Sequence, residues 1–151
     1  MHLHRIISKH LDPLQFAYKA NRSKEDVILH IINNSYAHLD KRKACVRLML
    51  YDFSSAFNMI QAHLLYDKMI KMSLPPALVL WVTDCLTSRQ QYVRLGPTVY
   101  SVTIITNTSA AQGTVLSPFF FCIYTSDYET TTNKCIDKYA GDTVLTGRPD
   151  H

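Results

Sequence analysis

The sequence predicts an α+β fold, in which helices pack against an antiparallel sheet. The run from Cys45 to Phe53 is short and almost wholly apolar, which is typical of an inner strand covered on both faces. Alternating apolar residues on either side of Gly96-Pro97, and again around Ala140-Gly141-Asp142, predict two hairpins. Helical spacing of apolar residues in the segments between them predicts the helices.

The helices have local start signals. Ser23 begins the first predicted helix, because its side chain can accept a backbone N–H and Asp26 follows three residues later, as in a capping box. Its predicted apolar face consists of Val27, Ile28, Ile31 and Ile32. A second helix is predicted to run to about Met72, with Ala56, Phe57, Ile60, Leu64 and Leu65 on its inner face. A third is predicted to begin at Pro75-Pro76, and a fourth to follow Gly113 with Pro118 in its first turn.

Length, composition and charge limit the class of protein. A chain of 151 residues fits one domain, and 47% hydrophobic with 19% charged residues is a globular composition. It has neither the roughly 20 consecutive apolar residues of a membrane span nor a signal-peptide core. We therefore expect a soluble intracellular protein, in the nucleus or the cytoplasm. Residues 1–47 carry nine Lys or Arg against four acids and residues 48–151 seven against eight, so the basic excess is N-terminal and suits phosphate contact.

The four cysteines are never two residues apart in a C-x-x-C pair, so neither a zinc knuckle nor a disulfide framework is indicated. Each has apolar neighbours, which predicts buried, reduced thiols.

Two acids stand out as candidate functional residues. Asp52 ends the apolar run, where a carboxylate is costly unless it is paired or bound to a metal. It could instead cap the following helix, although Ser54 and Ser55 are also suited to that role. Asp142 lies at the predicted tip of the last hairpin, and two such acids could share a metal.

Five segments, in this order, resemble the palm of reverse transcriptases, most closely those of non-LTR (LINE-type) retrotransposons. They are DPLQFAYKANRSKED at 12–26, YDFSSAFN at 51–58, LTSRQQYV at 86–93, AAQGTVLSP at 110–118 and KYAGDT at 138–143. A chance match to all five in the family's order and spacing is not plausible. The resemblance implies a polymerase palm-like antiparallel sheet packed against helices, with part of the fingers. It also implies that 1–151 is a single partial domain, with a fingers-like segment at 1–44, the palm at 45–151, and thumb and endonuclease absent.

The resemblance assigns a metal site to the sheet. In the family, an acid of the first palm strand and two adjacent acids at a hairpin tip hold two Mg²⁺ ions. Asp52 and Asp142 match two of these catalytic acids, and the backbone carbonyl of Phe53 is expected to assist in binding Mg²⁺. The implied reaction is nucleotidyl transfer from a dNTP to a DNA primer 3′-hydroxyl on an RNA template.

The resemblance also assigns nucleotide and template contacts. Phe57 matches the aromatic residue that packs under the incoming sugar, although it could instead be helix core. Gln112 and Gly113 match a loop that contacts template and nucleotide, where glycine permits close approach. Arg22 matches a basic residue of the fingers that lies near phosphates. The alternative is an exposed arginine before a helix that has no functional role.

Two positions depart from the family pattern. Where related elements read F-A-D-D or Y-A-D-D, this chain reads Y-A-G-D, so Gly141 replaces the first acid of the pair. We therefore expect catalysis to be severely impaired, because two carboxylates replace three around two divalent cations. Ala111 replaces a proline that would fix the backbone before Gln112.

Other functions remain open at this point. The basic N-terminal region and the incomplete acid set also suit a non-enzymatic remnant that binds nucleic acid or protein. A metal-dependent phosphohydrolase or cyclase has only the two acids in its favour. Without a thumb, apolar faces of the sheet and helices are expected to be exposed, which favours a protein partner that covers this edge.

Overall fold

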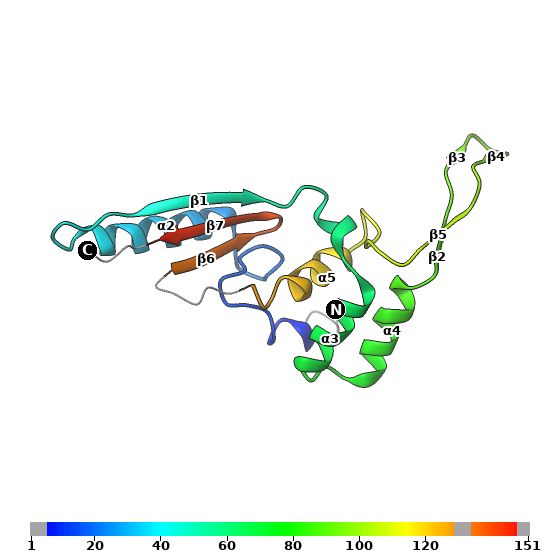
Figure 1. Cartoon of the computed structure of the whole chain (residues 1–151), viewed down its shortest axis with the longest axis horizontal. Helices are drawn as coiled ribbons and strands as arrows, with labels where there is room; N and C mark the ends of the chain where they lie inside the picture. The colour runs from blue at the N-terminus through cyan, green and yellow to red at the C-terminus, as the bar shows by residue number, and fades with distance from the viewer. Residues whose placement is uncertain (1–5, 129–133, 148–151) are drawn as a thin grey trace. The chain divides into compact units, whose positions relative to one another are not determined.

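The computed structural model describes residues 6–128 and 134–147 and divides into two compact units (Figure 1). The first unit, residues 1–56 with 125–151, contains α2, β1, β6 and β7. The second, residues 57–124, contains α3, α4, α5 and the strands β2 to β5. None of the helices in the described ranges is long and apolar enough to cross a membrane.

Helix α2 (Lys24–Leu39) begins as predicted, with Ser23 at the N-cap. The Ser23 hydroxyl accepts from the backbone N–H of Asp26, and the Asp26 carboxylate accepts from the backbone N–H of Ser23 at 2.7 Å, which completes a capping box.

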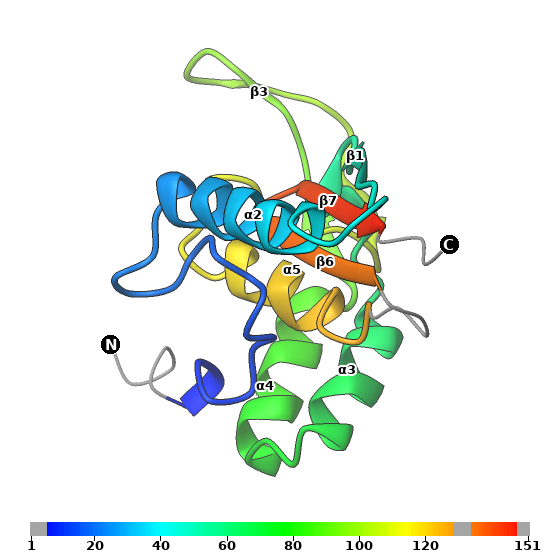
Figure 2. The ribbon, with the colours of Figure 1, turned by 90° about the vertical axis from the view of Figure 1, so that its left-hand side faces the viewer.

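The predicted apolar face of α2 is only partly correct. Val27 is buried, but Ile28 is 52% exposed and Ile32 41% exposed. The helix turns Val27, His30 and Ile31 inward instead, at the i, i+3, i+4 spacing of one face. This face packs against β6 (Lys134–Tyr139), and Figure 2 shows α2 lying across β6 and β7.

A three-stranded antiparallel sheet has the strand order β1-β7-β6, where β1 is Arg47–Asp52 and β7 is Asp142–Gly147. The prediction that β1 is an inner strand covered on both faces is wrong. It lies at the edge of the described sheet, and all six of its residues are exposed, Leu50 by 78%. An apolar run predicts a strand but does not say whether the strand lies at the centre or at the edge of the sheet, because that depends on strand order.

Strands β6 and β7 form the predicted hairpin, with Tyr139 paired to Asp142 across a two-residue turn of Ala140 and Gly141. The predicted position of Asp142 at the tip is corrected by one residue, because Asp142 is the first residue of β7. On the outer side of β6, the N-terminal segment pairs with Lys138, whose N–H donates to the Leu14 carbonyl at 2.9 Å. The Phe16 N–H donates to the Lys138 carbonyl at 2.8 Å, so this segment holds the edge opposite β1.

Helices α3 (Ala62–Lys71), α4 (Pro76–Leu86) and α5 (Ser117–Tyr124) form the core of the second unit. The proline start of α4 and the end of α3 near Met72 confirm the predictions. The prediction of a single helix from Ala56 was wrong, because a short 3₁₀ turn, η1 (Ala56–Met59), precedes α3. Apolar side chains buried in this unit include Ile60, Leu65, Met69, Val79, Val82, Phe120 and Ile123.

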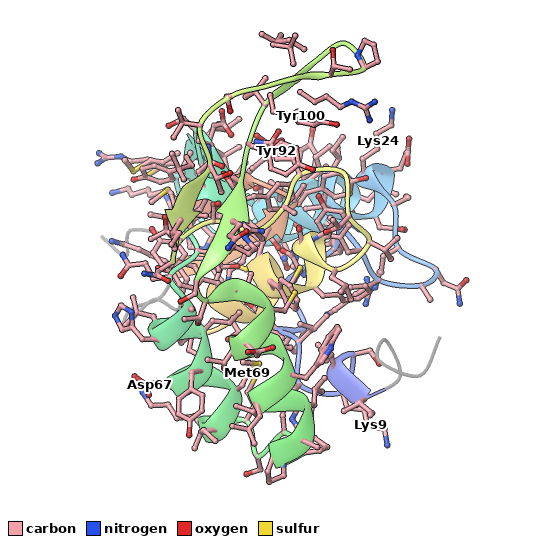
Figure 3. All side chains as sticks on the ribbon, turned by 90° about the vertical axis from the view of Figure 1, so that its right-hand side faces the viewer. Lys9, Lys24, Asp67, Met69, Tyr92 and Tyr100 are labelled. Atoms are coloured by element: carbon pink, nitrogen blue, oxygen red, sulfur yellow. The ribbon has the colours of Figure 1, made fainter. Side chains whose placement is uncertain are left out.

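The predicted hairpin between α4 and α5 is confirmed. It consists of two antiparallel pairs, β2 (Arg89–Gln91) with β5 (Ile104–Thr106), and β3 (Arg94–Leu95) with β4 (Val99–Tyr100). The rings of Tyr92 and Tyr100 pack edge to face with their centroids 5.4 Å apart, and both side chains are labelled in Figure 3.

The prediction of four buried thiols is wrong for three of them. Cys122 is buried, Cys45 and Cys135 are half-buried, and Cys85 is exposed. Apolar neighbours in the sequence do not set burial, because an amphipathic element has one exposed side.

Candidate active site

The two candidate acids lie opposite each other across β1 and β7. Asp52 is the register partner of Asp142. Directly opposed residues of an antiparallel pair project from the same face, with Cβ atoms about 4.5–5.5 Å apart. Both residues are exposed. Pairing of strands from distant parts of the chain thus puts two carboxylates on one accessible face of the first unit.

Gly141 lies beside this acid pair. A Cβ added to Gly141 would lie 3.6 Å from Asp52 Oδ1 and 3.8 Å from the Phe53 carbonyl oxygen. The Phe53 N–H donates to the Gly141 carbonyl at 3.1 Å, which continues the β1–β7 ladder past Asp52. A side chain at position 141 would therefore begin next to the Asp52 carboxylate and the Phe53 carbonyl.

The turn does not require glycine at position 141. The left-handed residue is Ala140, with φ of 54°, and Gly141 is not among the glycines with positive φ. All three heavy atoms nearest the added Cβ lie between 3.6 and 4.0 Å, which is ordinary van der Waals contact. An acidic residue is compatible with this backbone.

The acid pair has no compensating protein cation within the described residues. Neither Asp52 nor Asp142 forms an ion pair there with a lysine, arginine or histidine. Two neighbouring carboxylates on an exposed face, with a backbone carbonyl beside them, offer the hard oxygen ligands that Mg²⁺ prefers. The arrangement offers oxygen ligands of the kind a divalent cation takes, and the space at Gly141 is where a third carboxylate would begin.

Phe57 belongs to the second unit, where it packs on α5. Its ring meets Phe121 edge to face at 6.1 Å, and its carbonyl accepts from the Ala110 N–H at 2.8 Å. The half-buried ring therefore contributes to packing, as the helix-core alternative expects.

Gln112 and Gly113 are exposed in the loop before α5. Gly113 has φ of 77°, a left-handed conformation that favours glycine, and nothing lies within 4 Å of an added Cβ. The loop is held at its base, where the Ser117 hydroxyl donates to the Ala111 carbonyl at 2.6 Å. The left-handed backbone thus explains why glycine occupies position 113, and the loop is exposed to solvent.

Arg22 precedes α2 and is exposed, with its guanidinium 5.1 Å from the centre of the Phe16 ring. This cation–π contact holds the arginine near the N-terminus of α2.

The sequence did not single out a cluster between α2 and β6. His30, Cys135 and Asp137 place their ligand atoms within 4.8 Å of one another. The C-x-D alternation in β6 was visible, but its relation to His30, more than 100 residues earlier, depends on tertiary packing.

Comparisons with protein families and solved structures identify similar proteins. The family model described as reverse transcriptase (RNA-dependent DNA polymerase) matches residues 1–149. A solved structure of apo telomerase from Candida tropicalis, truncated from the C-terminal domain, matches 96% of this chain with a TM-score of 0.69 and 13% identity. The chain spans about a third of that protein, 33% of its length. No curated protein sequence matches. The structural match confirms the predicted α+β, palm-like fold.

Proposed function

Because this chain belongs to the reverse transcriptase family, we propose that its three-stranded sheet is the nucleotidyl-transfer site of an RNA-directed DNA polymerase in which Gly141 has removed one metal-binding acid. The observation that carries the proposal is the register of Asp52 against Asp142, with Gly141 next to the Asp52 carboxylate. The motif order supports a non-LTR (LINE-type) origin.

The residues present fit a divalent cation. We propose that the carboxylates of Asp52 and Asp142, with the Phe53 carbonyl, hold Mg²⁺. When bound, Mg²⁺ supplies charge stabilisation on the nucleotide phosphates and activation of the primer hydroxyl. Joining that hydroxyl to the α-phosphorus of a dNTP would release pyrophosphate.

The protein groups would supply position and charge. Asp52 and Asp142 are fixed by strand pairing on both sides of β7, so their separation is set by the sheet. The Gln112–Gly113 loop is exposed and suited to a template or nucleotide contact. With two carboxylates instead of three, the site balances less of the charge of two cations, and we propose that catalysis is severely impaired.

Primer extension tests this proposal. The purified chain, Asp52→Ala and Asp142→Ala are supplied with an RNA template, a DNA primer and dNTPs in Mg²⁺ or Mn²⁺. We expect wild-type incorporation at the level of the two variants. Robust incorporation that disappears in Asp52→Ala would refute the impairment.

Metal binding tests the site independently of turnover. We expect Mn²⁺, followed by its paramagnetic resonance signal, to bind the wild type and to bind Asp52→Ala more weakly by roughly tenfold or more, a difference of about 1.4 kcal/mol. Equal binding by both proteins would contradict the assignment of Asp52 as a ligand.

A second candidate function is a non-enzymatic remnant that binds nucleic acid. It is favoured by the N-terminal basic excess and by the exposed turn of Lys41, Arg42 and Lys43 after α2. Binding of RNA or DNA should then weaken steeply with salt and be unchanged in Asp52→Ala. Absence of binding at low salt would exclude it. The exposed strand β1 would suit a protein partner of such a remnant.

A further inference from the structure

Three side chains with different ligand atoms meet between α2 and β6. His30 comes from the inner face of α2, while Cys135 and Asp137 lie two residues apart on β6 and so share one face of the strand. One ring nitrogen, the thiol sulfur and a carboxylate oxygen all lie within 4.8 Å of one another. The cluster is confined to the first unit and includes neither Asp52 nor Asp142.

The cluster is already ordered by a direct contact. His30 Nδ1 lies 2.7 Å from Asp137 Oδ1, and the Asp137 side chain is only 1% exposed. A carboxylate this deeply buried is costly without a partner, so the histidine has a structural role in any case. The His30 side chain is 35% exposed, which leaves one side of the cluster open to solvent.

The surroundings of His30 orient its ring. The Asn34 amide nitrogen, one turn later on α2, lies 3.1 Å from His30 Nε2 and 3.3 Å from Nδ1, so Nε2 is the nearer partner. With the amide rotated by 180°, its oxygen accepts a hydrogen bond from Nε2–H, which leaves Nδ1 as the ligand atom. The Phe16 ring lies 5.4 Å from the imidazole and limits its movement.

We propose that His30, Cys135 and Asp137 form a zinc-binding site that ties α2 to β6. Imidazole nitrogen, thiolate sulfur and carboxylate oxygen are the three ligand types of Zn²⁺ in proteins, and they do not suit Mg²⁺ as a set. Three protein ligands leave a fourth tetrahedral position, which water fills from the open side of His30.

The geometry needs two adjustments: the ligand atoms span up to 4.8 Å, so the Cys135 sulfur must come up to about 1.3 Å closer, and the nitrogen and oxygen must move apart. In a tetrahedral zinc site the nitrogen and oxygen ligands are about 3.3 Å apart and nitrogen and sulfur about 3.5 Å apart. The present 2.7 Å contact is a hydrogen bond, so His30 Nδ1 and Asp137 Oδ1 must separate by about 0.6 Å. The Nδ1 proton moves to Nε2 or is released, and the Cys135 thiol loses its proton, as metal binding to such groups requires.

The simpler alternative is a buried His30–Asp137 pair that binds no metal. The two readings differ in the role of Cys135, because the hydrogen bond has no need of the thiol. Cys135 is half-buried, so Cys135→Ser is a conservative variant that should fold. Cys85 is an exposed thiol on α4 and supplies the matched control, Cys85→Ser.

The test is a Zn²⁺ titration of the reduced, untagged full chain, in competition with a chromophoric chelator, and a parallel titration with Co²⁺. We expect the wild type and Cys85→Ser each to bind one Zn²⁺ per chain tightly. With Co²⁺, both should show an absorption band from thiolate–Co²⁺ charge transfer. Cys135→Ser should lose that band and bind Zn²⁺ at least tenfold more weakly. His30→Gln should weaken Zn²⁺ binding to a similar extent. This variant provides the test if Cys135→Ser fails to fold.

Two outcomes would overturn the proposal. One is no stoichiometric Zn²⁺ binding by the folded wild type, which leaves only the His30–Asp137 pair. The other is binding unchanged in both Cys135→Ser and His30→Gln, which means an adventitious site elsewhere. His2 and His4, outside the described residues, are suited to such a site.

Discussion

Replacing Gly141 by aspartate tests the acid pair most directly, and Gly141→Asn is its control of equal size without charge. A Cβ at position 141 meets no atom closer than 3.6 Å, and Gly141 does not have positive φ. Both variants should therefore be accommodated by the turn. Their difference reports the charge at position 141 alone.

The expected magnitude follows from the distance to Asp52. The added Cβ lies 3.6 Å from Asp52 Oδ1, so the two carboxylates would be about 4 Å apart, where unit charges repel by about 1 kcal/mol in water and about 4 kcal/mol near a protein surface. Since Asp52 is exposed and Gly141 half-buried, solvent screening favours the lower value, about 1 kcal/mol. Without metal, Gly141→Asp should be less stable than Gly141→Asn by this amount, or about 2–4 °C in Tm.

A divalent cation should reverse this order. A third carboxylate beside Asp52 is attracted to the ion, so binding favours the folded aspartate variant. We expect Gly141→Asp to bind Mn²⁺ at least roughly tenfold more tightly than Gly141→Asn, about 1.4 kcal/mol. Thermal unfolding in chelator and in saturating Mg²⁺, with Mn²⁺ resonance titrations, measures both signs. If the two variants melt at the same temperature under both conditions, position 141 does not face Asp52 and the reasoning fails.

Three further predictions concern stability and use denaturant unfolding. Ser23→Ala should cost about 1 kcal/mol through loss of the α2 cap, whereas Ser35→Ala, inside the same helix, should stay within about 0.5 kcal/mol. Leu65→Ala should cost about 2–5 kcal/mol because Leu65 is fully buried in α3, and its 37% exposed neighbour gives the control, Leu64→Ala, at about 1 kcal/mol or less. Hydrogen bonds from its own backbone N–H and from Ser23 hold the pKa of Glu25 below its usual 4.5. The ionised Glu25 side chain therefore stabilises the protein at pH above 4.5, and this stabilisation is lost as the pH falls through the lowered pKa. Glu25→Gln should lower the unfolding free energy at neutral pH and have no effect on it in acid.

Local signals in the sequence were sufficient for the elements near the candidate site. The Ser23–Asp26 capping box, the proline start of α4 and the turn of Ala140 and Gly141 each depend on a few adjacent residues. Backbone hydrogen bonding and φ restrictions act at that range, so these elements could be predicted.

What the sequence left open depends on strand order and packing. An apolar run predicts β1 but not that Leu50 is exposed at an edge, and helical spacing predicts α2 but not which side meets β6. The pairing of Asp52 with Asp142 was expected only through the family resemblance. Spacing alone does not bring together two residues so far apart in the chain.

Ligand chemistry should distinguish the two proposed metal sites. Asp52, Asp142 and the Phe53 carbonyl offer only oxygen, which suits Mg²⁺ and Mn²⁺, whereas the cluster on α2 and β6 includes nitrogen and sulfur, which suit Zn²⁺. Gly141→Asp should therefore change Mn²⁺ binding and leave thiolate–Co²⁺ absorption unchanged, while Cys135→Ser should do the reverse. If either variant alters both signals equally, the two metals compete for one site, and the assignment of separate sites to the two ends of the β6–β7 hairpin is wrong.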